Sequence, residues 1–213
     1  MKRKTKFWTG GCLLAAFGLW TALVRLVDIR PIGPKGSEVG FAALNGFVHE
    51  TMGVHLALYA VTDWLSLIPL GCILVFAALG AVQWVRRKAI RKVDRSILVL
   101  GGFYATVLAA FLFFEKVVVN YRPVLINGVL EASYPSSTTM LVLCVMPTAM
   151  MQLRERMKPG KLRLSIMAVL AVFTAFMVIG RLISGVHWFS DIVGGVLLSG
   201  GLVALYSAVC EEK

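Results

Sequence analysis

The sequence predicts an all-α membrane protein, a polytopic bundle of six transmembrane helices. Hydrophobic residues make up 58% of the 213 residues and charged residues only 15%, and the mean hydropathy is +0.80. Water-soluble domains contain roughly 45–50% apolar and about 25% charged residues, so this composition excludes an ordinary soluble domain. The charges lie in short clusters between long uncharged runs. Because lipid offers no partner for exposed backbone groups, such runs must form helices.

Six uncharged stretches approach or reach the length of about 20 residues that crosses a hydrocarbon core. In chain order they are 7–24, 64–85, 96–114, 132–153, 164–180 and 192–210. A seventh apolar stretch, 51–62, is too short to span and predicts an interfacial helix within an extracytoplasmic loop at 29–62. Small residues at Gly195 and Ser199 indicate a close helix contact in the last span. No repeat divides the chain, so residues 1–213 are interpreted as one domain.

The first stretch is interpreted as a membrane anchor. A basic start followed by an apolar run also fits a cleaved signal peptide, but no small-x-small cleavage site precedes Arg25. The cysteines all fall inside predicted spans and have neither metal-ligand spacing nor a plausible disulfide framework. They are interpreted as small buried hydrophobic residues: Cys12, Cys72, Cys144 and Cys210.

The distribution of Lys and Arg predicts the orientation. Sixteen of the 22 basic residues lie on one side of the predicted spans, at the two termini and in the connections 86–95 and 154–163. Short cytoplasmic loops carry such an excess, so both termini are expected in the cytoplasm, and the outer segments 25–63, 115–131 and 181–191 outside the cell membrane. The net charge of +11 is therefore explained by the membrane topology and does not indicate nucleic-acid binding.

Residues that carry chemistry concentrate on the predicted outer side. Arg181, His187 and Asp191 are spaced six and four residues apart at the start of the last helix. Four residues are about one helical turn, so His187 and Asp191 can share a face. An Asp beside an imidazole holds its tautomer and stabilises its cationic form. The pattern therefore predicts a nucleophilic or basic histidine.

Two further outer segments predict an anion site. Lys116 and Arg122 follow the outer end of the third predicted helix, and residues 134–139 (Tyr-Pro-Ser-Ser-Thr-Thr) open the fourth. A helix start presents free backbone N–H groups and the positive end of the helix dipole, which favours phosphate.

Together these segments resemble the three motifs of the type 2 phosphatidic acid phosphatase superfamily, integral-membrane and related enzymes that dephosphorylate lipid phosphates and diphosphates. The family pattern is Lys, six residues, Arg-Pro; then Pro-Ser-Gly-His; then Ser-Arg, five residues, His, three residues, Asp. The third motif matches at Arg181, His187 and Asp191. The order of the motifs, the helix count and the sidedness also agree, and the resemblance covers the chain from the third predicted helix to the last.

The resemblance implies that His187 attacks phosphorus to form a phosphohistidine and that Asp191 orients it. The phosphate would be held by residues of all three motifs: Lys116, Arg122, Ser136, Ser137, Thr138 and Arg181. No metal and no cofactor is expected, because cations and a helix N-terminus can neutralise the transferring phosphoryl group. The implied partners are a lipid phosphate or diphosphate substrate and the surrounding membrane lipids.

Four positions depart from the family pattern. Only five residues separate Lys116 from Arg122, which rotates Lys116 by about 100° if the helix continues that far. Gly180 replaces the family's serine, and Ser137 replaces its glycine. Thr138 replaces the family's histidine, which protonates the departing oxygen.

Thr138 leaves two functions open. In the first, the chain is a phosphatase that favours a polyprenyl diphosphate, because a phosphate group with a second pKa near 6 departs without a proton whereas an alkoxide needs one. Phosphatidic acid and phosphatidylglycerol phosphate remain candidates, and His49 is an alternative proton source. In the second, the chain is a catalytically impaired protein that binds or transports lipid phosphates. The intact pair of His187 and Asp191 favours the enzyme.

Overall fold

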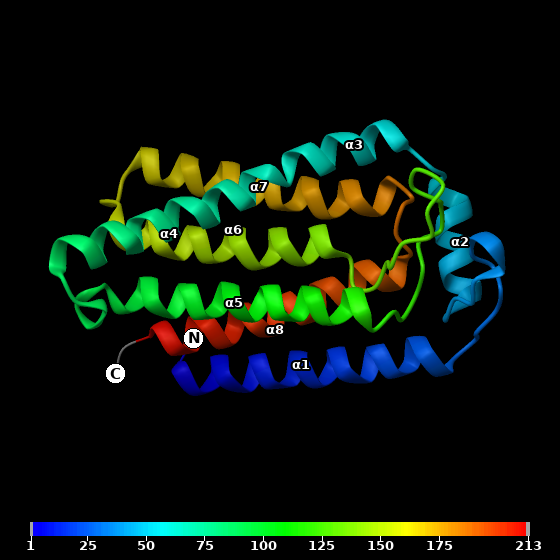
Figure 1. The fold of residues 1–213 in the computed structure, drawn as a ribbon, viewed down its shortest axis with the longest axis horizontal. Helices are drawn as coiled ribbons and strands as arrows, with labels where there is room; N and C mark the ends of the chain where they lie inside the picture. The colour runs from blue at the N-terminus through cyan, green and yellow to red at the C-terminus, as the bar shows by residue number, and fades with distance from the viewer. Residues whose placement is uncertain (1, 212–213) are drawn as a thin grey trace.

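A computed structural model describes residues 2–211, whose helices run lengthwise through the molecule except for one short helix across its end (Figure 1). In chain order the α-helices are α1 (Arg3–Leu26), α2 (Ala42–Met52), α3 (Leu56–Leu65), α4 (Leu67–Arg87), α5 (Arg95–Lys116), α6 (Ser137–Arg156), α7 (Lys161–Ile183) and α8 (Phe189–Cys210). Single 3-10 turns lie at Pro34–Gly36 and Ile90–Lys92. The all-α class is confirmed.

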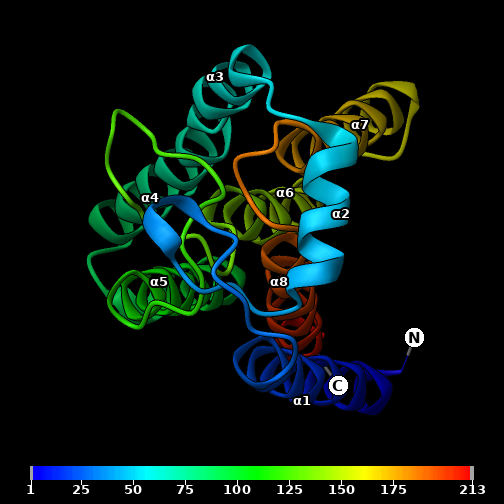
Figure 2. The same ribbon diagram turned by 90° about the vertical axis from the view of Figure 1, so that its right-hand side faces the viewer.

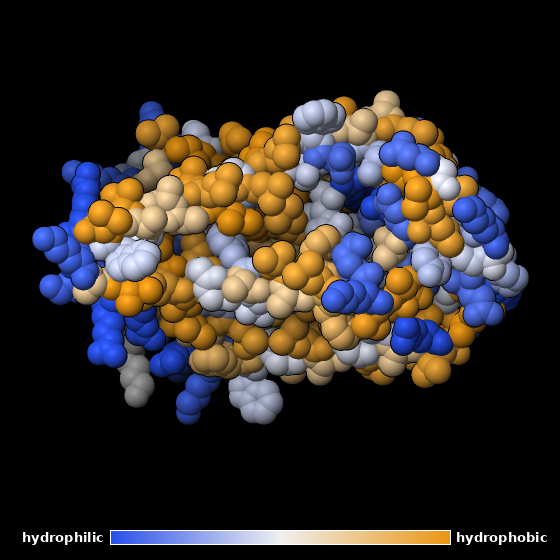
Figure 3. Space-filling view, in the orientation of Figure 1, coloured by the Kyte–Doolittle hydropathy of each residue, from blue (hydrophilic) through white to orange (hydrophobic). Residues whose placement is uncertain are grey.

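Each predicted span corresponds to a long helix. Within the described residues, five helices are long and apolar enough to cross a membrane: α1, the joined pair α3 and α4, α5, α7 and α8. Figure 3 shows the resulting hydrophobic band between more hydrophilic ends. The remaining predicted span, 132–153, corresponds to α6, which carries buried polar residues such as Thr148 and Gln152 and is therefore less apolar.

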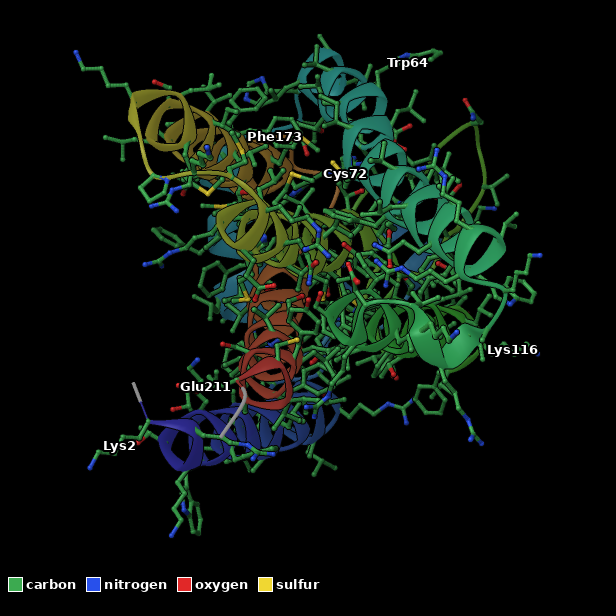
Figure 4. The ribbon with its side chains drawn as sticks, turned by 90° about the vertical axis from the view of Figure 1, so that its left-hand side faces the viewer. Lys2, Trp64, Cys72, Lys116, Phe173 and Glu211 are labelled. Carbon is green, nitrogen blue, oxygen red and sulfur yellow. The ribbon has the colours of Figure 1, made fainter. Side chains whose placement is uncertain are left out.

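α6 lies at the centre of the bundle. Figure 2 shows it among α4, α5, α7 and α8, all of which contact it, while α1 packs on the far side of α8. A helix that other helices surround meets little lipid, so it tolerates polar side chains that find partners inside the bundle. Gln152 Nε2, for example, donates to the Tyr206 hydroxyl at 2.6 Å. On its other side, Cys72 of α4 and Phe173 of α7 pack against a buried hydrophobic cluster of α6 and α7 (Figure 4).

The predicted close contact of the last span is with α6. A Cβ added at Gly195 would lie 3.1 Å from Thr139 Cγ2, and Ser199 Oγ donates to the Met140 carbonyl at 3.4 Å. This close approach brings the start of α6 against the first turns of α8, where two of the predicted motifs lie.

The short helix of the first outer connection differs from the prediction. α2 ends at Met52, and the following Gly53 has a φ of 71° that stops the helix. Residues 56–65 form α3, which runs on into α4 because Ser66 keeps right-handed helical angles, φ −65° and ψ −14°. The expected interfacial helix at 51–62 is therefore wrong in position, since a glycine break sets the helix ends there.

Both described ends of the chain lie at one end of the bundle, with the α4–α5 and α6–α7 connections (Figure 1). We call this the basic end, because most Lys and Arg residues collect there. Lys213, counted among those basic residues in the sequence, lies outside the described residues. The opposite end, called the outer end, gathers α2 and the connections α1–α2, α5–α6 and α7–α8.

Candidate active site

A hairpin-like loop between α5 and α6 carries one predicted motif back toward another. The Ser133 N–H donates to the Asn120 carbonyl at 2.9 Å, which closes the loop. The loop reverses at Asn127 and Gly128, whose φ values of 52° and 76° are those that a two-residue type I′ turn requires. The Asn-Gly pair is the sequence signal for this turn, and a prediction based on helical spans overlooks it. The loop also pairs Arg122 with Glu131, whose carbonyl accepts from the Arg122 N–H at 3.0 Å.

His187 lies in the short connection between α7 and α8 and is buried. Its Nδ1 is 3.9 Å from Asp191 Oδ2, too far for a hydrogen bond. Ser133 Oγ lies between them, 3.0 Å from His187 Nδ1 and 2.5 Å from Asp191 Oδ2. A carboxylate only accepts, so the hydroxyl donates to Asp191 and accepts from the Nδ1–H of His187. The carboxylate thus orients the imidazole through Ser133, a residue that the sequence did not single out.

Asp191 is held by further donors around the first turn of α8. Asn120 Nδ2 donates to Oδ1 at 3.2 Å, and the Trp188 N–H donates to Oδ2 at 2.9 Å. The Asp191 carbonyl accepts from the Ser136 N–H at 3.1 Å. Gly194 permits this approach, because a Cβ there would lie 2.6 Å from the Tyr134 ring. The hairpin, the start of α6 and the start of α8 are thereby joined at one residue, Asp191.

Arg181 lies in the last turn of α7 with only 2% of its side chain exposed. Its Nη2 donates to Thr138 Oγ1 at 2.6 Å and to Asp63 Oδ1 at 2.9 Å. Its guanidinium also lies over the Tyr59 ring, 4.8 Å from the centroid. The Nε and Nη1 atoms of Arg181 are buried and have no hydrogen-bond partner.

Arg122 approaches the same ring from the hairpin, with its guanidinium carbon 5.9 Å from the Tyr59 centroid. Its Nε is 3.1 Å from Glu131 Oε2, a distance that makes an ion pair. The pair lacks hydrogen-bond geometry, however, so Nε and Nη1 of Arg122 also remain without a hydrogen-bond partner.

Within the described residues, both arginines and His187 thus bring buried nitrogens without hydrogen-bond partners to this site, and the one of His187 is Nε2. Burial is the main cause that holds the pKa of His187 well below its usual value, and the charges of Arg122 and Arg181 lower that pKa further. The imidazole is consequently neutral near pH 7, with a free lone pair on Nε2 when Nδ1 carries the proton. Because nearly all buried polar groups in proteins are paired, this arrangement is suited to a bound anion.

The start of α6 lies beside this group. Ser136 is the N-cap, and its Oγ accepts from the Thr139 N–H at 3.5 Å. Ser137 is half-buried, and Thr138, the neighbour of Arg181, is buried. The predicted residues of the second motif are therefore close to Arg181, at a helix N-terminus that favours negative charge.

Lys116 is the predicted site residue that the structure does not bring to this group. It is exposed at the last position of α5, and Figure 4 shows its side chain projecting from the rim of the bundle. His49, the alternative proton source, lies on α2 with its ring 5.4 Å from that of Trp188. Trp64, beside Asp63, is 75% exposed and also points outward in Figure 4.

A largely apolar cavity of about 620 Å³ lies between α4, α5 and α6 and reaches the site. Figure 3 shows the hollow on its visible face. Apolar side chains from the three helices line most of it: Leu70, Ile73, Leu108, Phe111 and Leu141. Its polar residues include Asp63, Ser137 and Thr138.

The chain was compared with known proteins. The model of the PAP2 superfamily matches residues 102–213, which include His187, Asp191 and both arginines of the site. The structure resembles a crystal structure described as the first transmembrane PAP2 type phosphatidylglycerolphosphate phosphatase from Bacillus subtilis. The TM-score is 0.66 at 17% sequence identity, over 95% of this chain and 94% of that chain, a similarity of fold. No curated protein matches the chain in sequence.

Proposed function

The chain belongs to the PAP2 superfamily, and we propose that it is a membrane lipid phosphatase that transfers a phosphoryl group first to His187 and then to water. The observation that carries the proposal is the set of buried, unpartnered nitrogens of Arg122, Arg181 and His187. Guanidinium groups bind phosphate oxygens well. An anion-binding pocket has no need of an imidazole held in one tautomer, whereas a nucleophile does.

In the proposed mechanism, Arg122 and Arg181 bind the phosphate oxygens together with the N-terminus of α6. The Nε2 lone pair of His187 attacks phosphorus as the bond to the lipid oxygen breaks. The Nδ1 proton stays in its hydrogen bond to Ser133, and the charge of Asp191 stabilises the phosphorylated imidazole. Water then releases phosphate from Nε2. Two guanidinium groups and a helix start supply the positive charge, so this mechanism needs neither a metal nor a cofactor.

We infer that the lipid chain occupies the apolar cavity between α4, α5 and α6. Thr138, at its polar end, cannot act as a general acid near neutral pH, which favours a leaving group that departs without a proton. A polyprenyl diphosphate releases such a group, because the second pKa of a phosphate is about 6. Phosphatidylglycerol phosphate and phosphatidic acid release an alkoxide and are expected to react more slowly.

The test is phosphate release by the purified protein in detergent, with a chelator present, on those three lipids. We expect fastest turnover on the diphosphate, complete loss in His187→Ala, and a large loss in Asp191→Asn with the fold retained. Thr138→His should raise monoester turnover more than diphosphate turnover, since a general acid contributes about 10²- to 10⁴-fold where one is needed. Tight binding of all three lipids without phosphate release would instead support a binding or transport protein.

We further propose that the basic end faces the cytoplasm and the outer end, with the site, faces away from it. The support is the excess of basic residues at the first end, 16 of the 22 in the chain. On this orientation both termini are cytoplasmic and the site lies at the outer face of the cell membrane.

A further inference from the structure

Helix α3 brings a carboxylate to the polar end of the cavity. Asp63 Oδ1 accepts a hydrogen bond from Arg181 Nη2 at 2.9 Å, and the same nitrogen donates to Thr138 Oγ1 at 2.6 Å. Asp63 is 58% exposed while Arg181 is 2% exposed. The carboxylate thus lies on the open side of a buried cation, where a molecule in the cavity can reach it.

A close helix contact makes this position possible. A Cβ added at Gly180 of α7 would lie 2.9 Å from Cγ2 of Thr62, and Thr62 is fully buried. Gly180 therefore lets α3 pack against α7 beside Arg181. Gly180, one of the departures from the family pattern, therefore borders the helix that supplies Asp63 and Tyr59 to the site. Thr138, another departure, shares Arg181 Nη2 with Asp63.

The place of the leaving group follows from the cavity and the arginines. If the lipid chain fills the cavity and the phosphate lies on Arg122 and Arg181, the bond that breaks lies at the polar end of the cavity. The side chains there are those of Asp63, Ser137 and Thr138. Among these three, the carboxyl of Asp63 is the group suited to proton transfer with a leaving oxygen or a water.

Substrate binding changes the charges around Asp63. The charged and titratable groups that face it are Arg181 from α7, Tyr59 on its own helix, Tyr104 of α5 in the same cavity lining, and Arg122 across the Tyr59 ring. A phosphate bound to Arg181 competes for the cation that pairs with Asp63 and adds a like charge beside it. Both changes weaken the ion pair between Asp63 and Arg181 and free the carboxyl for contact with the substrate.

We propose that Asp63 is the acid–base residue of this site, in an inference that rests on the proposed phosphatase function. In the first step the carboxyl proton passes to the leaving oxygen, which takes the electron pair of the breaking P–O bond. In the second step the carboxylate accepts a proton from water while the water oxygen bonds to phosphorus. The electron pair of the P–N bond returns to His187 Nε2, and Asp63 again carries its proton.

The two substrate classes need this residue differently. A phosphomonoester requires Asp63 in both steps, because an alkoxide cannot depart unprotonated. A diphosphate releases a stable phosphate anion without taking a proton, so with this substrate Asp63 stays the carboxylate that pairs with Arg181 and is required only when water attacks the phosphohistidine. It then passes the proton that it accepts to solvent. Loss of the carboxyl should therefore trap the phosphohistidine with a diphosphate and prevent its formation with a phosphomonoester.

The experiment compares Asp63→Asn with Glu50→Gln, the same chemical change at an exposed residue of α2 at the outer end. With radiolabelled polyprenyl diphosphate, Asp63→Asn should form about one phosphohistidine per protein and then turn over about 10²- to 10⁴-fold more slowly than the unmodified protein. With phosphatidic acid it should form no phosphohistidine at the same times. Glu50→Gln should behave as the unmodified protein with both lipids.

Two results would overturn the assignment. The first is unchanged turnover of phosphatidic acid in Asp63→Asn. The second is loss of phosphohistidine with both lipids in a folded variant, which means that Asp63 only positions Arg181. Asp63→Ala provides a second readout, because added formate should restore turnover only if the carboxyl acts in proton transfer. Absence of phosphohistidine in the unmodified protein would instead contradict the proposed function, and both proposals would then fall.

Discussion

Replacement of Ser133 by alanine tests how the carboxylate of Asp191 controls His187. The Ser133 hydroxyl is 3.0 Å from His187 Nδ1 and 2.5 Å from Asp191 Oδ2, and the direct separation of these two residues is 3.9 Å. Ser133→Ala therefore removes the contact that fixes the Nδ1–H tautomer. A hydrogen bond to a charged group contributes about 1.5–3 kcal/mol. Since about 1.36 kcal/mol corresponds to a tenfold change in rate, the expected loss is about 10- to 150-fold.

The assay is the initial rate of phosphate release from polyprenyl diphosphate in detergent. Ser207→Ala is the matched control, because Ser207 lies on α8 toward the basic end and should leave the rate unchanged. The double variant Ser133→Ala/Asp191→Asn should lose little more than Asp191→Asn alone, because both changes interrupt one connection.

Two outcomes would refute this reasoning. A wild-type rate in Ser133→Ala would mean that Asp191 orients His187 without the serine. A loss as complete as that of His187→Ala, in a protein that keeps its thermal stability, would mean that Ser133 takes part in the chemistry itself.

Three further predictions concern packing, protonation and orientation. Gly180→Ala should lower turnover by displacing α3, because the added Cβ meets Thr62 Cγ2 at 2.9 Å, and Thr62→Ala in the same chain should restore it. In NMR titration of a variant with His49 and His55 replaced by Gln, His187 should stay neutral down to below pH 6.5. In the unfolded chain this histidine binds a proton near pH 6.5, whereas folded His187 stays neutral at that pH. The free energy of unfolding should therefore fall as the pH drops below about 6.5. In a cysteine-free background, a single cysteine at Lys35 or Gly128 should react with an impermeant maleimide in intact cells and one at Lys88 should not; the reverse pattern would invert the topology.

Hydropathy was sufficient to predict the long helices because lipid imposes length and apolarity on each span separately. α6 was predicted on the same grounds, although its burial among other helices, and not contact with lipid, explains its buried Thr148 and Gln152. The break after α2 was missed, since it depends on the positive φ of Gly53 and not on hydropathy.

The third motif was predictable from its residue types and spacing, but His187 precedes α8 and is connected to Asp191 through Ser133, not as a neighbour on one helical face. Ser133 and Asn120 escaped notice, since their approach to Asp191 depends on backbone pairing across a hairpin whose signal is an Asn-Gly pair. Lys116 was predicted from the family pattern but projects from the rim, because α5 ends at this residue and the chain then leaves the helix.

The role of Asp63 could not be predicted from the sequence for a different reason. In the sequence it lies beside Trp64 at the boundary of an apolar run, where an acidic residue needs no other explanation. Its partner Arg181 lies 118 residues away, and the two meet only because Gly180 lets α3 pack against α7 next to Thr138. The glycine at position 180 and the threonine at position 138 are therefore parts of one arrangement, in which the Asp63 carboxyl of α3 takes the place of the acid histidine that the second motif lacks.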